Sequence, residues 1–259
     1  RKPRGVDRGR IKKGKPGDNA GLPGVILLPG IMGSNLAVVN GNKRNRIWLD
    51  VSDLMRGRGR KLAVDGGFNV EAAGVLDSPY AKFRNYLVQH NIHVMPMAYD
   101  WRLSLEEAAG LLNNLVTERL AAAPGQPLHL VAHSMGGLVA SLFMRRHPDT
   151  WQNLRDSGGR LVQAGTPNLG SYVIPRILQG KEQMIRLMAA IDADHGLSRW
   201  TRWTSRFNGL LELAPSFGAP NFSRVQTWQQ LDVMNAPTAS DLRTAQSVKD
   251  ALMKLRITP

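Results

Sequence analysis

The stretch A-H-S-M-G-G over residues 132–137 constrains the fold of this chain more than any other. It follows an apolar run, 128–131, and precedes apolar residues at helical spacing over 138–146. Together these segments predict a buried strand, a tight turn with Ser134 at its tip, and a helix. Such a turn strains the serine backbone and needs small neighbours, which alanine and glycine supply. A glycine-rich strand-to-helix connection with an incidental serine would share this pattern, so the motif needs independent support.

A second stretch, residues 22–34, reads as a buried strand that runs into a glycine-rich loop. In the α/β-hydrolase fold, a turn of the kind described above carries the nucleophilic serine. One oxyanion-hole N–H comes from a loop after an early strand, and the other from the residue after the nucleophile. Ser134 would then be the catalytic nucleophile here, with Ile31 and Met135 as the two donors. Both donors are backbone N–H groups. The glycines of the loop, Gly30 and Gly33, let it approach a substrate closely.

Five motifs occur in order along residues 22–220. They are P-G-I-M-G-S-N-L at 29–36, I-W-L-D at 47–50, Y-D-W-R-L at 99–103, H-S-M-G-G at 133–137 and G-T-P-N-L-G-S at 165–171. In this order they resemble the lecithin:cholesterol acyltransferase family, which includes lysosomal phospholipases and bacterial relatives. The resemblance implies an acyl-ester hydrolase or acyltransferase acting on lipid, with Ser134, Ile31 and Met135 at the family's nucleophile and oxyanion positions. It also implies that Asp100 and Arg102 form a structural, buried ion pair.

The end of the chain departs from the family pattern. In the family, the catalytic acid and histidine follow the segment that matches 211–216 and lie at the ends of two more strands. In this sequence, apolar residues after that segment recur at helical spacing, over 228–234 and 240–255. We therefore expect the last strands, and with them the catalytic acid and base, to be absent from this sequence.

Two histidines follow Ser134, and neither is a good candidate for the base. His147 precedes a proline at the end of the nucleophile helix, several turns from the serine. His195 lies in a lid-like segment, and a mobile lid holds hydrogen-bond geometry poorly. His133, next to the nucleophile, is expected to point away from it and to be structural.

Glycine and proline divide the chain into segments. We expect residues 1–20 to be a flexible basic tail and 21–259 to be one incomplete α/β-hydrolase domain. Within it, 37–75 is expected to be a cap insertion and 171–217 a lid-like insertion.

The remaining segments alternate between helix and strand. Helices are predicted over 77–89 and, after an N-cap serine at 104, to about 122. A buried strand is predicted over 160–164. This alternation favours a mostly parallel sheet with helices on both faces.

The composition is that of a globular domain, with 42% hydrophobic and 21% charged residues. The chain has no cysteine, which excludes disulfides, thiol chemistry and cysteine metal sites and points to a cytoplasmic, bacterial setting. No apolar run approaches the roughly 20 residues of a membrane span, and no signal-peptide core follows the basic N-terminus. We expect no cofactor and no metal ion.

The net charge of +14 is high for such a domain, and basic residues crowd 1–15 and 43–61. Solvated charge is one explanation. An anionic membrane surface is another, since each basic residue near acidic lipid contributes on the order of 1 kcal/mol. Nucleic acid would attract the same charges, but no recognition helix, stacking motif or zinc spacing supports it. Tryptophan and arginine in 171–217 suit a lipid–water boundary, although packing onto the core explains them equally well.

These features predict a serine acyl-ester hydrolase or acyltransferase that acts on lipid through a Ser134 acyl-enzyme. The full triad is not visible in the chain. The alternative is a non-catalytic, hydrolase-like module that binds lipid or a protein partner within a larger protein.

Overall fold

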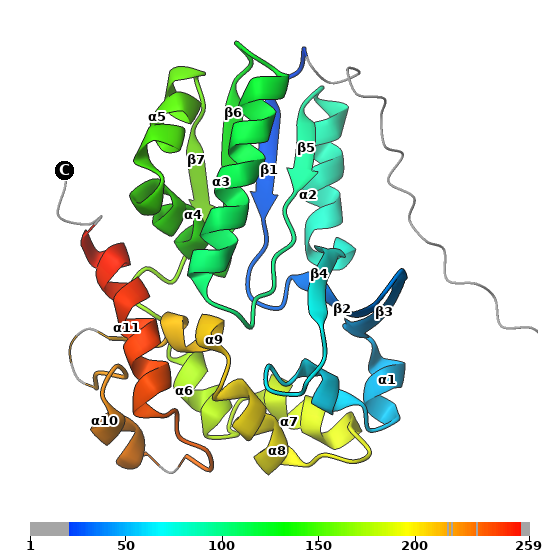
Figure 1. The fold of residues 1–259 in the computed structure, drawn as a ribbon, viewed down its shortest axis with the longest axis vertical. Helices are drawn as coiled ribbons and strands as arrows, with labels where there is room; N and C mark the ends of the chain where they lie inside the picture. Colours follow the sequence, from blue (N-terminus) through cyan, green and yellow to red (C-terminus); the bar gives the residue numbers. More distant parts are fainter. Residues whose placement is uncertain (1–20, 217, 219, 232, 255–259) are drawn as a thin grey trace, which may run out of the picture.

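The computed structural model describes residues 21–216, 218, 220–231 and 233–254 (Figure 1). The tail predicted for 1–20 lies outside these residues. A four-stranded parallel sheet, in the order β5-β1-β6-β7, lies at the centre of the fold. Its strands are β1 (Gly24–Leu28), β5 (His93–Pro96), β6 (Leu128–His133) and β7 (Leu161–Ala164). The alternating α/β architecture predicted from the sequence is confirmed.

Four helices accompany this sheet. They are α2 (Asp77–Gln89), α3 (Leu105–Ala122), α4 (Met135–Arg146) and α5 (Pro148–Asp156). Helix α3 begins where predicted, because the Ser104 side chain accepts a hydrogen bond from the Glu106 N–H, 3.3 Å away. Helices α3 and α4 pack on each other, and α4 also packs on β6.

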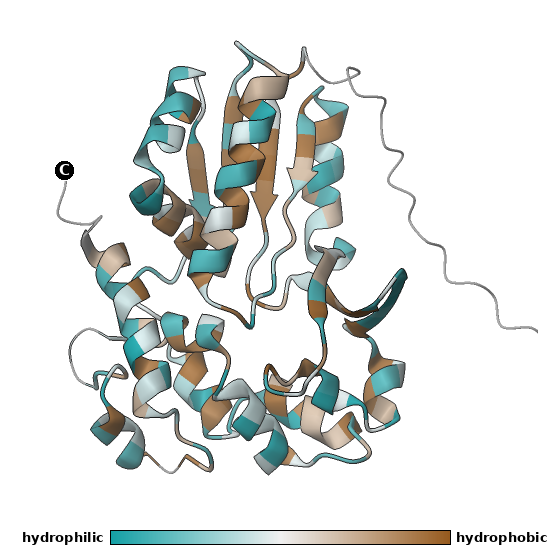
Figure 2. Cartoon of the chain, in the orientation of Figure 1, coloured by the Kyte–Doolittle hydropathy of each residue, from teal (hydrophilic) through white to brown (hydrophobic). Residues whose placement is uncertain are grey.

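Burial is uneven across the parallel sheet. All five residues of β1 are buried, whereas in β6 buried residues alternate with half-buried ones. Figure 2 shows the hydrophobic strands at the centre of this layer. Cover on both faces, as predicted, therefore holds fully only at β1. The strand predicted over 160–164 is present as β7, but the prediction that it is buried is wrong. It pairs with β6 at the sheet edge, and Val162 is 54% exposed.

Residues 34–75 contain an antiparallel sheet that was not predicted. Its order is β3-β2-β4, with β2 (Ser34–Asn40), β3 (Lys43–Trp48) and β4 (Val70–Val75). The first four residues of β3, K-R-N-R, are all polar and exposed. The strand therefore lacks the alternation of apolar and polar residues from which a strand is predicted. The remaining signal was the pair Gly41–Asn42, which forms the two-residue turn between β2 and β3.

The other helices lie mostly beyond the carboxyl ends of the parallel strands (Figure 1). They are α1 (Val51–Met55), the 3-10 helix η1 (Gly59–Leu62), α6 (Val173–Leu178), α7 (Gln183–Ile191), α8 (Leu197–Thr204), α9 (Asn208–Leu213), α10 (Val225–Gln229) and α11 (Ala239–Lys254). The described residues after Leu213 form helices and no strand, as their spacing predicted. However, the helix predicted over 228–234 ends at Gln229, where the chain turns and Leu231 N–H bonds the Trp228 carbonyl.

Most apolar side chains of the segment 171–217 pack onto the core. Ile185, Met188, Trp200 and Trp203 are buried, whereas Tyr172 and Leu187 are strongly exposed, at 56% and 55%. Core packing therefore explains the greater part of this apolar stripe. Whether the segment moves as a lid stays a prediction. Within the described ranges, no helix is long and apolar enough to cross a membrane.

Candidate active site

Ser134 occupies the tight turn between β6 and α4, as predicted. Its φ is 51° and its ψ is −121°, a conformation that costs a non-glycine residue free energy. The Ser134 N–H donates to the Ala164 carbonyl of β7 at 2.8 Å, which ties the strained turn to the neighbouring strand. The residue is half-buried. This is the strained strand-to-helix turn that the sequence pattern predicted.

Two glycines let the turn and the loop after β1 come into contact. A Cβ on Gly136 would lie 2.7 Å from the Pro29 carbonyl oxygen, so the start of α4 presses on the end of β1. A Cβ on Gly30 would lie 3.0 Å from Ser134 Cβ. The loop that carries Ile31 is therefore placed directly beside the serine.

The two predicted donors flank Ser134 in this arrangement. Met135 is the first residue of α4, so its N–H has no intrahelical partner and lies at the positive end of the helix dipole. In the loop, the Gly30 N–H bonds Tyr80 Oη and the Gly33 N–H bonds the Gly30 carbonyl, whereas the Ile31 N–H has no partner among the described residues. The structure thus brings all three predicted site residues to the carboxyl ends of β1 and β6.

Tyr80 of α2 is a site residue that the sequence motifs did not reveal. Its hydroxyl accepts from Gly30 N–H at 2.8 Å and lies 3.0 Å from His133 Nδ1. Burial raises the pKa of Tyr80, which keeps the hydroxyl neutral. This network joins His133, which precedes Ser134, to Gly30, which precedes Ile31. The contact fits the structural role expected for His133. Tyr80 stood out in the sequence only as one apolar position of a helix.

A second tyrosine fixes the same loop from the other side. Tyr99, in the Y-D-W-R-L motif, donates its hydroxyl proton to the Pro29 carbonyl at 2.7 Å. Its side chain is buried, and burial raises the pKa of Tyr99, so the hydroxyl remains a donor. Its N–H donates to Ser34 Oγ at 3.1 Å. The loop is therefore held at both of its ends.

The ion pair expected in the same motif is present. Arg102 Nε donates to Asp100 Oδ1 at 2.9 Å, and the two side chains are only 4% and 8% exposed. Arg102 also donates to the Leu62 carbonyl of η1 at 2.9 Å. The pair joins the segment after β5 to η1, in the connection between β3 and β4, which is a structural role.

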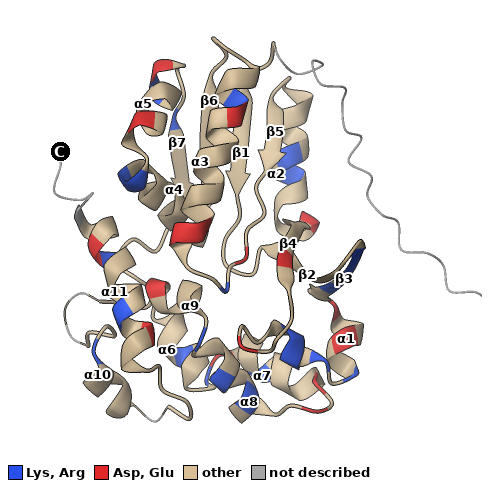
Figure 3. Ribbon diagram, viewed as in Figure 1, with Lys and Arg blue, Asp and Glu red and all other residues tan. Residues whose placement is uncertain are grey.

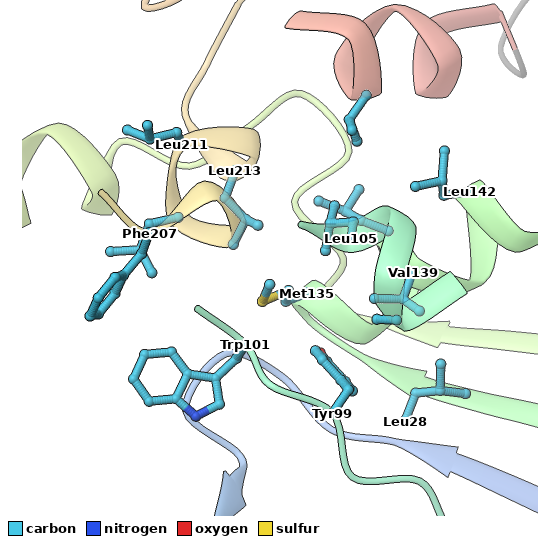
Figure 4. Close-up of a cluster of buried hydrophobic side chains, with 14 of the residues drawn as sticks. Leu28, Tyr99, Trp101, Leu105, Met135, Val139, Leu142, Phe207, Leu211 and Leu213 are labelled. Atoms are coloured by element: carbon cyan, nitrogen blue, oxygen red, sulfur yellow. The ribbon is translucent and has the colours of Figure 1, made fainter. Parts of the chain in front are cut away.

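The side chain of Met135 forms part of the floor under the turn (Figure 4). It is fully buried and belongs to the same cluster of buried apolar side chains as Trp101, Phe207 and Leu213. A Cβ on Gly209 would lie 2.8 Å from Met135 Cε, so α9 packs tightly beneath the turn at Ser134 between β6 and α4, here called the elbow. Apolar packing from three separate segments therefore supports the helix start.

The two histidines that follow Ser134 are not in the elbow. His147 caps the far end of α4, about 18 Å from its start at 1.5 Å per residue over 12 residues. His195 lines a cavity beside α8, and its Nδ1 lies 3.1 Å from Asp192 Oδ1. None of the residues that line this cavity comes from the turn at Ser134 or the loop after β1. Neither histidine is therefore assigned to Ser134.

The family model of lecithin:cholesterol acyltransferase matches residues 52–240. The chain belongs to the lecithin:cholesterol acyltransferase family. The resemblance to this family and the α/β-hydrolase fold are thereby confirmed. The match includes the elbow and the Y-D-W-R-L motif, while Ile31 lies before it.

Individual members of the lecithin:cholesterol acyltransferase family are identical to this chain at about a third of the aligned residues. Phosphatidylcholine-sterol acyltransferase of Oryctolagus cuniculus is 31% identical over 165 residues, which is 61% of this chain and 36% of that protein. The enzyme of the same name from Homo sapiens is 31% identical over 141 residues, 52% of this chain and 31% of its own length. The chain thus spans about a third of these relatives. They are mammalian proteins, so the bacterial and cytoplasmic setting stays a prediction.

Proposed function

We propose that the protein is a lipid acyl-ester hydrolase or acyltransferase in which Ser134 is the nucleophile. The observation that carries this proposal is the strained Ser134 backbone, with the Gly30–Ile31 loop packed directly against it. A structural serine in an ordinary turn would need neither. Family membership supports acyl transfer in general, and the names of the relatives support phospholipid as the acyl donor.

The reaction follows from the positions of these groups. Ser134 Oγ attacks the carbonyl carbon of a lipid ester, and the carbonyl oxygen becomes an oxyanion. The N–H groups of Ile31 and Met135 donate to that oxyanion, and α4 adds the positive end of its dipole. The ester C–O bond breaks, the alcohol leaves with a proton, and the acyl group remains on Ser134. Water or an acceptor alcohol then takes the acyl group and restores the serine hydroxyl.

The surface beyond the strand ends suits peripheral contact with an anionic lipid surface. Helices α1 and α7 are in contact and expose apolar side chains, with Met55 at 63% and Leu187 at 55%. Arg56 is the C-cap of α1 and Arg186 lies on α7, and Figure 3 shows Lys and Arg along this end of the molecule. Apolar side chains interleaved with cations are typical of surfaces that lie on acidic lipid.

Labelling with a fluorophosphonate probe tests the nucleophile. With a catalytic acid and base supplied, the protein is expected to be labelled at Ser134, and Ser134→Ala is expected to lose both the label and lipid ester turnover. Ser240→Ala, a change at an exposed serine of α11, serves as the matched control and keeps both. Labelling that persists in Ser134→Ala would refute the assignment. An unlabelled protein that still binds vesicles would support the non-catalytic module instead.

A further inference from the structure

A cavity of about 500 Å³ lies away from the elbow, between the chain around η1 and helix α8. Arg60 and Asp65 line it on the η1 side, and Arg199, Arg202 and Trp203 line it on the α8 side. The three arginines are all solvent-accessible at their side chains.

The two segments that form the walls of this cavity also contact each other directly. A Cβ on Gly59 would lie 2.0 Å from Asp192 Oδ2, and a Cβ on Gly57 would lie 2.1 Å from Asp194 Oδ2. The two carboxylates therefore press on glycine backbone that no other residue could replace without movement. Because this contact joins the η1 segment to the loop before α8, the cavity is formed by the fold and not by flexible side chains alone.

Three arginines line this space, and none has an ion-pair partner among the described residues. Arg199, Arg202 and Trp203 follow the i, i+3, i+4 spacing of one helix face, and Arg60 faces them from the other wall. In the described part of the chain, none of the three arginines forms a salt bridge, although Arg58 and Arg206 nearby do. Unpaired like charges around one cavity repel each other, which an anion between them would relieve.

His195 is oriented as a fourth partner. Its Nδ1 lies 3.1 and 3.2 Å from the two oxygens of Asp192, whose side chain is fully buried. Asp192 also accepts from Trp200 Nε1 at 3.2 Å and from the Asp194 N–H at 3.1 Å, so the carboxylate is fixed. The imidazole packs edge-on against Trp203, with ring centroids 4.9 Å apart. The carboxylate and the indole fix the ring, and Nε2 remains to meet a ligand.

We propose that this cavity binds a phosphate group, held by Arg60, Arg199 and Arg202 with His195 Nε2 as an additional partner. Guanidinium groups match phosphate oxygens in pairs, and three of them can surround one tetrahedral anion. Asp65 and Asp194 line the same cavity and limit its positive charge, so a single phosphate suits it better than a polyanion. The phosphate can be free or part of a lipid headgroup. The proposal does not depend on the role of Ser134.

Titration calorimetry with inorganic phosphate tests the site in the full-length protein. We expect saturable binding that weakens at least tenfold in Arg199→Gln/Arg202→Gln. Arg243→Gln, which removes one positive charge from an exposed position of α11, is the control and keeps the wild-type affinity. Circular dichroism establishes that each variant is folded. Absence of saturable binding would overturn the proposal, as would equal losses in the double variant and in Arg243→Gln.

Vesicles distinguish the two sources of the phosphate. If a lipid headgroup occupies the cavity, binding to phosphatidic acid vesicles falls in the folded double variant and free phosphate competes with it. If free phosphate is the ligand, the vesicle binding is unchanged while the calorimetric loss remains. Ser134→Ala is expected to bind phosphate normally, so failure of the proposed catalytic role would leave this result intact.

Discussion

Glu212 of α9 is buried at the N-terminus of α3 and makes the stability of this protein depend on pH. Its side chain accepts from Ser104 Oγ and from Leu105 N–H, each at 2.7 Å. Only 3% of the residue is exposed, and burial raises the pKa of Glu212 to about 7 from its ordinary 4.5. Lys249 of α11 is also buried, and burial lowers the pKa of Lys249 to about 8.

The raised pKa means that the folded protein holds the Glu212 proton more tightly than the unfolded chain does. The stability from this group is fully present below pH 4.5 and is lost as the pH rises through about 7. Since a tenfold change in proton affinity equals about 1.4 kcal/mol, the loss amounts to about 3 kcal/mol of unfolding free energy. Lys249 is mostly protonated below pH 7, because its pKa is about 8. The stability that it contributes in its neutral form is therefore already lost there and does not add to the change from Glu212.

Urea unfolding of Glu212→Gln at several pH values between 4.5 and 7.5 measures this contribution. The substitution keeps an acceptor for Leu105 N–H but removes the titration, so the variant is expected to lose about 3 kcal/mol less than the wild type across this range. Glu118→Gln, at an exposed position of α3, should retain the wild-type pH dependence. Identical pH profiles for Glu212→Gln and the wild type would refute the reasoning.

Three further changes test the elbow and its supports. Tyr80→Phe leaves the buried Gly30 N–H without its partner, at a cost of about 1–3 kcal/mol in denaturant unfolding, and is expected to lower ester turnover about 10-fold or more; unchanged turnover would contradict a role for the loop. Gly136→Ala pushes the start of α4 off the Pro29 carbonyl and should lower fluorophosphonate labelling, whereas Gly110→Ala in α3, where a Cβ meets nothing, should not. Asp100→Asn leaves the buried Arg102 charge unpaired and should cost about 3–5 kcal/mol by urea unfolding; a cost under about 1 kcal/mol would show that the pair is dispensable.

Local sequence was sufficient for several parts of the fold. The apolar run before Ser134 and the helical spacing after it predicted β6 and α4, and the N-cap serine predicted the start of α3. These signals succeed because strand burial, helix capping and the small residues of a tight turn act between neighbours in the chain. Where packing partners were distant, prediction failed. The exposed face of β7 follows from its place at the sheet edge, which its own residues do not encode.

The sequence alone determined that Ser134 lies on a tight turn between a strand and a helix, because that turn depends only on adjacent residues. The tertiary structure decided what surrounds the turn. Tyr80 is separated from His133 by 53 positions and from Gly30 by 50, yet one hydroxyl joins both. Likewise, Arg60 faces Arg199 across a cavity because glycine backbone lets two distant segments meet. Hydrogen bonds and cavities depend on three-dimensional proximity, which the order of residues along a chain does not display.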